Sequence, residues 1–411
     1  MLQSRLAIAA ILLAAAASPA AAGVWTATWA ASPEATWGAK LPLPTRIPAT
    51  LADATVRQVA RIALGGDGLR IEISNRYGPE PLQIGSAHVA AAFGGGAIDP
   101  KTDHAVRFGG SAKVSVPPGQ AVVSDPVDLS VADLAKVAVS LYLPKETPLA
   151  TFHWDGKETA YVARGDHGAA EKISPESTLE ARLFLTAIHV ERPQSTAVVA
   201  AFGDSITDGD GVSVDGDRRW PDILAERLAP QGVSVINAGI SGARLLKPGM
   251  GEAGLDRFDR DVLAQPGIRS VIVMMGTNDL AWGETPFDPH SAPFLPAAIE
   301  DGYRKLVARA HARGVRIVGA TITPFEGAFA GTPIANFWNP AKNRVRLAVN
   351  EWIRTSGTFD AVLDFDAVAR DPNDVSKLRA DVDSGDHLHP GDAGNAVVAE
   401  GIDLGAVLGA R

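Results

Sequence analysis

The stretch Ala197-Val-Val-Ala-Ala-Phe-Gly-Asp-Ser-Ile-Thr-Asp-Gly209 decides the fold of the second half of this 411-residue chain. Its first six residues form a continuous apolar run, which is typical of a parallel strand buried on both faces. The run ends at Gly203-Asp204-Ser205, where small and polar residues predict the turn from a strand into a helix. Open parallel sheets bind ligands outside the carboxyl ends of their strands, so Ser205 marks the edge at which we look for a functional site.

Further apolar runs of the same kind follow, and helical patterns separate them. The runs span residues 233–236, 270–275, 315–321 and 361–365. The helical patterns span residues 221–228, 255–263, 299–313, 343–356 and 392–408. Buried strands that alternate with helices predict an α/β fold, built around a five-stranded parallel sheet, for residues 193–411.

The preceding residues, 23–192, have a different rhythm of short and often alternating segments. Residues 55–62 and 69–74 alternate on either side of Gly65-Gly66, which predicts a β-hairpin with one buried face. Further strands are predicted at residues 87–92, 112–116, 136–143 and 181–190. Many short strands without a long helical pattern predict an all-β sandwich or jelly-roll domain.

The first 22 residues have the pattern of a secretory signal peptide. Arg5 precedes an apolar stretch over residues 6–17, and the small residues Ala20-Ala21-Ala22 supply a cleavage site. A membrane anchor is the alternative, but the apolar run is too short to span a bilayer comfortably. We therefore expect an exported protein, periplasmic or extracellular, without a membrane anchor after cleavage.

Composition excludes several classes of protein. The formal net charge is −9, and the sequence has no run of Lys and Arg, which argues against a nucleic-acid partner. The chain has no cysteine, so it can form neither a disulfide nor a thiol nucleophile.

Polar groups follow four of the predicted strands. These groups are Ser205, the glycine-rich segment 237–242, Asn278 and the segment 386–390, which contains an aspartate and two histidines. Each has an ordinary alternative: a helix cap, turn glycines, a loop carboxamide and a surface ion pair, respectively. Their joint occurrence in order, each at a strand end, favours acyl-transfer chemistry instead.

The same segments carry a family resemblance. They resemble the four signature blocks of the SGNH (GDSL) hydrolases, in the order Gly203-Asp204-Ser205, Asn237-Ala-Gly-Ile-Ser-Gly242, Gly276-Thr-Asn-Asp279 and Asp386-His-Leu-His-Pro390. The resemblance covers about residues 198–408 and implies a flavodoxin-like three-layer fold. It implies that Ser205 is the nucleophile, His389 the general base and Asp386 the acid that orients it. Gly242 and Asn278 would complete the oxyanion hole beside the Ser205 amide.

The chemistry of these side chains agrees with those roles. A serine hydroxyl needs a base to take its proton during attack, and an imidazole is suited to that task. Neighbouring polar residues have other expected roles: Asp204 and Asp279 as buried hydrogen-bond anchors, and His387 as a structural residue.

No cofactor or metal is expected. Residues 208–217 contain Asp-Gly pairs that resemble calcium loops, but the twelve-residue pattern with a terminal glutamate is missing. Gly203 and Gly209 do not form a phosphate loop because no Gly-Lys-Ser/Thr follows. Ser205 is also outside a Gly-x-Ser-x-Gly elbow, which argues against an α/β-hydrolase fold.

The substrate is indicated only by a softer resemblance. Segments 29–33, 70–78 and 383–390 resemble two-domain SGNH proteins that are likened to xylanase-associated acetylesterases or arylesterases. This implies a short acyl group, such as acetyl, on a carbohydrate or a small ester. Trp282, Asn336 and Trp338 are expected at the mouth of the site, where aromatic rings could stack on sugars or simply pack.

Two alternatives stay open at this point. An extracellular lipase, lysophospholipase or arylesterase would use the same catalytic groups on other esters. A carbohydrate-binding protein would use Trp37 and Trp154 of the first domain as stacking residues, although a buried tryptophan in a β-sandwich is the commoner arrangement.

Overall fold

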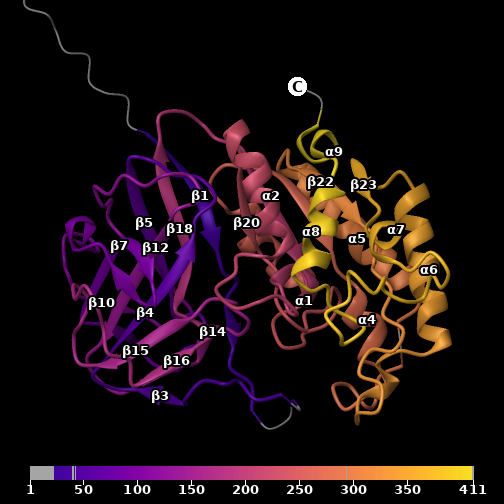
Figure 1. The fold of residues 1–411 in the computed structure, drawn as a ribbon, viewed down its shortest axis with the longest axis horizontal. Helices are drawn as coiled ribbons and strands as arrows, with labels where there is room; N and C mark the ends of the chain where they lie inside the picture. The colour runs from indigo at the N-terminus through magenta and orange to yellow at the C-terminus, as the bar shows by residue number, and fades with distance from the viewer. Residues whose placement is uncertain (1–22, 39–40, 42, 293, 410–411) are drawn as a thin grey trace, which may run out of the picture.

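The computed structural model describes residues 23–38, 41, 43–292 and 294–409. The signal peptide expected over residues 1–22 lies outside the described residues. Figure 1 shows a β-rich half, residues 23–192, beside an α/β half, residues 193–409. Strand β18 ends at Arg192 and the first strand of the α/β half begins at Val198, so the short connection between them joins the two halves.

The α/β half is built on a parallel sheet of five strands, as the sequence predicts. The strand order is β20-β19-β21-β22-β23, the 2-1-3-4-5 order of flavodoxin-like folds. In chain order the strands are β19 (Val198–Gly203), β20 (Ser234–Asn237), β21 (Ile268–Met274), β22 (Arg316–Ala320) and β23 (Ala361–Leu363).

Helices cover both faces of this sheet. Val199 and Ala201 of β19 pack in one core with helices α2 and α8, whereas Val198 and Ala200 pack in the other core with α5 and α6. The helices are α1 (Ser205–Asp208), α2 (Trp220–Leu228), α3 (Gly254–Phe258), α4 (Thr277–Ala281), α5 (Pro296–Ala312), α6 (Pro340–Thr355), α7 (Phe365–Ala369), α8 (Asp392–Glu400) and α9 (Leu404–Leu408).

Two of the expected helices differ in detail. The pattern over 392–408 forms two helices, because α8 ends at Gly401 and the Asp403 side chain caps the start of α9. The pattern over 255–263 forms α3 followed by a π-helical turn at Asp259–Leu263.

The β-rich half is mostly sheet, as the sequence predicts, while its jelly-roll connectivity stays a prediction. One sheet contains β1 (Val24–Ala30), β18 (Leu185–Arg192), β5 (Gly68–Ser74) and β11 (Ala121–Val123). A larger sheet contains β16 (Ser177–Leu179), β15 (Ala160–Arg164), β4 (Ala54–Arg61), β12 (Lys136–Leu143), β7 (Ser86–Gly94), β8 (Ala97–Ile98) and β9 (His104–Ala105). Shorter pairs add β2 (Glu34–Ala35), β3 (Thr50–Leu51), β6 (Leu82–Ile84), β10 (Val114–Val116), β13 (Thr147–Pro148), β14 (Thr151–His153) and β17 (Arg182–Leu183).

The hairpin predicted across Gly65-Gly66 is wrong. The two strands, β4 and β5, belong to different sheets and direct Val56 and Ile71 into one shared core. A side chain at Gly65 would place its Cβ 2.0 Å from the Val131 carbonyl oxygen, so the glycines let the chain pass close to a neighbouring segment. Alternation identified the strands correctly but could not identify their partners.

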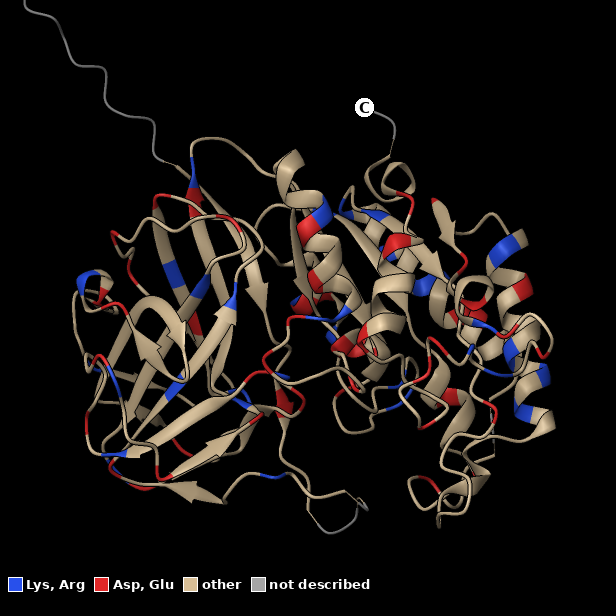
Figure 2. Cartoon of the chain, viewed as in Figure 1, with Lys and Arg blue, Asp and Glu red and all other residues tan. Residues whose placement is uncertain are grey.

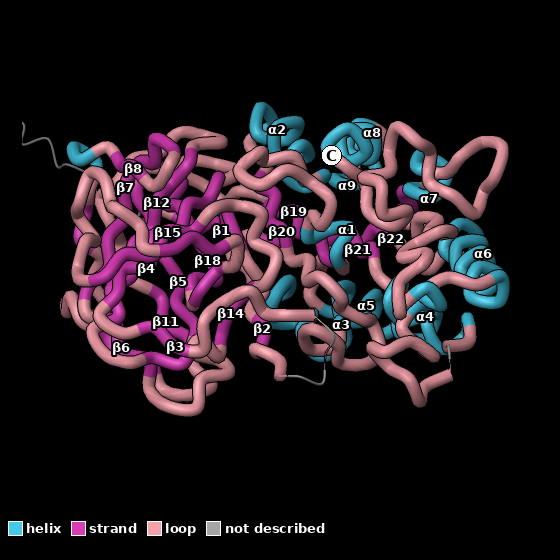
Figure 3. Tube along the Cα trace, turned by 60° about the horizontal axis from the view of Figure 1, so that its bottom comes forward, coloured by secondary structure: helices cyan, strands magenta, loops and turns pink. Residues whose placement is uncertain are grey.

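The two halves are joined by hydrogen bonds as well as by packing. Strand β1 pairs with β18 and forms the edge of its sheet, and the Ser234 hydroxyl of β20 donates to the Ala27 carbonyl at 2.7 Å. The Ala27 amide donates to the Pro266 carbonyl at 3.0 Å. The tube in Figure 3 shows β1 and β20 side by side where the halves meet.

Charged residues are spread over the whole molecule. Figure 2 shows Lys and Arg interspersed with Asp and Glu over both halves, including the region where they meet. Among the described residues, the structure contains no helix with the length and apolar character needed to cross a membrane.

Candidate active site

The turn after β19 places Ser205 at the start of α1. Asp204 caps this helix, and its side chain accepts a hydrogen bond from the Ile206 amide at 3.2 Å. Burial raises the pKa of Asp204 to about 6. A Cβ at Gly203 would lie 2.1 Å from Thr207 Oγ1, so the turn is too tight for another residue there. Asp204 therefore anchors the turn, the role that the sequence predicts.

The structure brings Ser205, His389 and Asp386 together although 184 positions separate the serine from the histidine. His389 Nε2 lies 2.8 Å from Ser205 Oγ, and His389 Nδ1 lies 2.6 Å from Asp386 Oδ2. The other oxygen of Asp386 accepts hydrogen bonds from the Leu388 and His389 amides, at 2.9 and 2.8 Å. Ser205 is 8% exposed and His389 is 4% exposed, so the pair is largely shielded from water.

The electrostatic surroundings favour a charged His389–Asp386 pair. Burial disfavours the imidazolium, but the charges of Asp210 and Asp386 and the hydrogen bond to Asp386 outweigh it and raise the pKa of His389. Burial alone would raise the pKa of Asp386, yet its hydrogen bonds and the charge of His389 hold it well below its usual range. An ionised Asp386 can fix the imidazole tautomer and stabilise the imidazolium that forms during a reaction.

The two expected oxyanion-hole residues follow the strands on either side of β19. Gly242 lies after β20 with a φ of 71°, and a Cβ there would approach Met250 Sδ to 2.4 Å. Asn278 lies on α4, directly after β21, and its Nδ2 donates to the Ala243 carbonyl at 3.0 Å. Its Oδ1 accepts from Trp282 Nε1 at 2.9 Å, which fixes the orientation of the amide and leaves one Nδ2 hydrogen available.

Asp279 anchors the loop that carries Gly242. Its carboxylate oxygens accept hydrogen bonds from the Leu245 and Leu246 amides, at 2.6 and 3.0 Å. Burial raises the pKa of Asp279 to about 6. Its position agrees with the anchoring role that the sequence predicts.

Of the two roles left open for Trp282, the structure shows packing, and the ring presents no free face to a sugar. Its side chain is 3% exposed and stacks on Phe287, with ring centroids 4.7 Å apart. Its indole nitrogen holds the Asn278 carboxamide, so it supports the site from behind. Asn336 is exposed and bonds the Glu284 carbonyl, and Trp338 packs half-buried against the core. Substrate binding by these last two residues stays a prediction.

The remaining expectations concern three other side chains. His387 is exposed and pairs with Asp383, with Nδ1 2.5 Å from Oδ2, which agrees with a structural role. Trp154 is 9% exposed and packs edge to face against Trp37, with ring centroids 5.8 Å apart. These two tryptophans therefore pack against each other rather than presenting free faces to a polysaccharide.

The sequence analysis missed a group of charged side chains close to the site. Asp208 and Asp210 lie just beyond Ser205, and His153 and Lys157 reach them from the β-rich half. The Asp-rich segment after Ser205 was a visible signal, but nothing in the sequence indicates its partners some 55 residues upstream. No group of three or more His, Asp or Glu side chains in the described part of the chain could hold a metal ion.

Comparison with known proteins identifies the α/β half. The model of the GDSL-like lipase/acylhydrolase family matches residues 201–397. No curated protein sequence matches the chain.

Several solved structures resemble about half of the chain. The psychrotrophic esterase EstA from Pseudoalteromonas sp. is 18% identical, with 50% of this chain and 93% of that chain covered and a TM-score of 0.36. The lipase/acylhydrolase from Enterococcus faecalis is 19% identical over 50% and 93% of the two chains, with a TM-score of 0.37. An acetyl xylan esterase is 21% identical over 50% and 96%, with a TM-score of 0.36.

Proposed function

We propose that Ser205, His389 and Asp386 perform the chemistry of a carboxylic ester hydrolase, because residues 201–397 match the GDSL-like lipase/acylhydrolase family. The single observation that carries this assignment is the continuous hydrogen-bonded line from Ser205 Oγ through the His389 ring to the Asp386 carboxylate. Neither step of the reaction needs a group beyond these side chains, the site's amides and water.

In the first step Ser205 Oγ attacks the ester carbonyl while His389 Nε2 takes the hydroxyl proton. His389 then gives this proton to the departing alkoxide, and an acyl-enzyme remains on Ser205. In the second step His389 takes a proton from water, the hydroxide attacks the acyl carbonyl, and Ser205 leaves with the proton restored. Asp386 stays ionised throughout and stabilises the imidazolium.

The negative charge on the carbonyl oxygen needs hydrogen-bond donors at the strand ends. We assign the amides of Ser205 and Gly242 and the Nδ2 of Asn278 to this role. The positive φ of Gly242 and the two hydrogen bonds of Asn278 fix both groups before substrate binds. Donors that are fixed in advance need no reorganisation when charge develops on the oxygen.

For the substrate we propose a short acyl ester, such as an acetyl group on a carbohydrate or on a small alcohol. The exposure of Ser205, only 8%, supports a small acyl group because little of the nucleophile is open to a bulky chain. The carbohydrate alcohol and the export of the protein rest on the sequence patterns of segments 29–33, 70–78, 383–390 and 1–22. A lipase, a lysophospholipase or an arylesterase is the alternative, and a pure carbohydrate binder is the least favoured.

Two measurements test these proposals. Ser205→Ala should abolish hydrolysis of p-nitrophenyl acetate while the thermal unfolding midpoint is retained; retained hydrolysis would overturn the catalytic assignment. Rates on p-nitrophenyl acetate, octanoate and palmitate should fall with acyl length, and acetate should be released from acetylated xylan or pectin. Faster hydrolysis of the long esters would establish the lipase alternative.

A further inference from the structure

We propose that the β-rich half supplies part of the active site: His153 is a positioning residue that holds Asp208, and Asp208 in turn holds the loop that presents Gly242. This inference rests on the proposed function, because it concerns the same catalytic site. It assigns the β-rich half a role in the chemistry itself, in place of a separate binding module.

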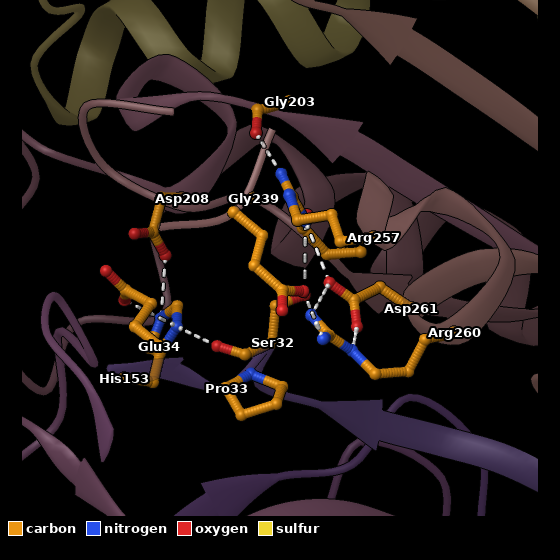
Figure 4. Close-up of polar contacts among 12 residues, drawn as sticks. Ser32, Pro33, Glu34, His153, Gly203, Asp208, Gly239, Arg257, Arg260 and Asp261 are labelled. Carbon is orange, nitrogen blue, oxygen red and sulfur yellow. Dashed lines mark hydrogen bonds and ion pairs between the residues drawn. The ribbon is translucent and has the colours of Figure 1, made fainter. Parts of the chain in front are cut away.

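The first argument is the hydrogen bonding of His153, which is 4% exposed at the end of β14. Its Nδ1 lies 3.0 Å from the Ser32 carbonyl oxygen, and its Nε2 lies 2.9 Å from Asp208 Oδ1 (Figure 4). A carbonyl and a carboxylate can only accept, so both ring nitrogens must carry a proton. His153 is therefore an imidazolium, paired with the Asp208 carboxylate inside the protein.

The charges around His153 support the same state. Burial would lower the pKa of His153, but the charge and hydrogen bond of Asp208 are the main causes that raise it to about 9. Glu34 Oε1 lies 3.5 Å from His153 Nδ1 and accepts the Trp154 amide at 3.0 Å. Asp208 has a lowered pKa, because the charge and hydrogen bond of His153 outweigh its burial.

The second argument is what Asp208 does with its other oxygen. Asp208 Oδ2 accepts hydrogen bonds from the Ser241 amide at 2.8 Å and from the Ser241 hydroxyl at 3.0 Å. Ser241 directly precedes Gly242, and Asp208 lies on α1, the helix that begins with Ser205. Asp208 thus fixes the distance between the nucleophile's helix and the oxyanion loop, and His153 neutralises its buried charge.

The third argument is that neighbouring residues of the same segment also reach the site. Asp155 Oδ2 accepts from the Ser241 hydroxyl at 3.3 Å, and Lys157 Nζ lies 3.1 Å from Asp155 Oδ1. Lys157 Nζ also lies 3.4 Å from Asp210 Oδ1, and Asp210 Oδ2 lies 3.8 Å from His389 Nε2. Alternate residues 153, 155 and 157 therefore contact the oxyanion loop on one side and the surroundings of the base on the other.

A polar contact elsewhere between the halves provides a matched control. Arg61 of β4 binds Glu226 Oε1 at 2.8 Å and the Asp222 carbonyl at 3.0 Å, both on helix α2. Its loss removes a cation of the β-rich half without touching the Gly242 loop. Arg61→Met should therefore keep the activity of the unaltered protein.

The test measures kcat and KM separately for p-nitrophenyl acetate in the full chain. His153→Phe keeps a ring but removes both N–H donors, and misplacing reacting groups by about 1 Å typically costs up to about 100-fold in rate. We expect kcat to fall about 10- to 100-fold with KM within about twofold, and His153→Gln, which keeps one donor, to lie between. An unchanged kcat in a folded His153→Phe variant, or a change in KM alone, would overturn the inference.

A double-substitution cycle keeps the test decisive if His153→Phe does not fold. If His153 acts through Asp208, then His153→Gln combined with Asp208→Asn should lose no more kcat than Asp208→Asn alone. Losses that multiply would show that His153 acts by another route, and the inference would fail. The Ser205→Ala variant separates this inference from the proposed function. If Ser205→Ala retains activity, the proposed function itself is wrong. If Ser205→Ala is inactive and His153→Phe is fully active, only the role of His153 is overturned.

Discussion

Both halves of the molecule place side chains near the carboxyl ends of the parallel strands, but the side chains from the two halves differ in kind. The α/β half supplies the proposed reacting groups, and backbone amides and carbonyls fix several of them, as at Asp386 and Asn278. The β-rich half supplies buried charges, His153 and Lys157, that pair with the acidic residues beside the nucleophile. We therefore infer that the α/β half performs the reaction and that the β-rich half controls the electrostatics around the reacting groups.

The largest effect should come from the reacting half, with Asp386→Asn. The amide accepts a weaker hydrogen bond from His389 than a carboxylate does and favours the wrong tautomer, so we expect kcat to fall roughly 10⁴-fold. Steady-state kinetics on p-nitrophenyl acetate measure the loss. Asp383→Asn is a matched control on the same loop, because Asp383 pairs with the exposed His387. Equal losses in both variants would mean that the loop fold, not the Asp386 charge, is what matters.

Asn278→Asp should have the next largest effect. The substitution keeps the size of the side chain but removes the donor from the oxyanion position, and losing one such donor costs roughly 10²–10³ in kcat. Asn373→Asp introduces the same change at an exposed position away from the site and should leave kcat unaltered. An increase in KM with an unchanged kcat would mean that Asn278 binds the substrate and does not stabilise the oxyanion.

These two variants probe residues that the sequence already indicated, and the reason is local. Ser205, Gly242 and Asn278 lie in segments that follow buried strands, and the parallel topology brings those strand ends to one edge. The expectation that Asp386 and His389 follow the fifth strand in the same way is wrong, because they lie in the loop between α7 and α8. The sheet itself followed from the apolar runs. The sequence left open whether Trp282 stacks on sugar or packs, because its spacing could not reveal that its ring is stacked on Phe287 and bonded to Asn278.

The contributions of the β-rich half could not be predicted in the same way. His153 meets Asp208 across 55 positions and between two halves of different fold, so no periodicity or motif links them. The strand pairing failed for the same reason: β4 and β5 are neighbours in sequence, yet they lie in facing sheets. Long-range contacts are decided by how whole surfaces pack, which local patterns do not record.

A smaller effect should appear in the pH dependence of kcat/KM. His389 must be neutral to act as a base, so the rate rises with pH through its pKa, which Asp210, Asp386 and Asp204 raise against the effect of burial. Asp210→Asn removes one of these charges and should move the rise to lower pH. Lys157→Met leaves Asp210 without its cation and should move the rise to higher pH. Lys145→Met, at an exposed position of the same half, should leave the profile in place; a shift there equal to that of Lys157→Met would point to net charge as the cause.

The smallest effect concerns stability and comes from two buried groups of the β-rich half. The pKa of His153 is raised from 6.5 to about 9 in the folded protein, and the pKa of Glu34 is raised from 4.5 to about 8. Each group binds more protons in the folded than in the unfolded state between its two values, so stability falls as pH rises through these ranges. The thermal unfolding midpoint should therefore decline between about pH 4.5 and pH 9, and His153→Phe combined with Glu34→Gln should flatten this decline. If the unfolding midpoint of the double variant declines with pH as steeply as that of the unaltered protein, other groups cause the pH dependence of stability. The charges of the β-rich half would then act on the reaction without setting the alkaline limit of the fold.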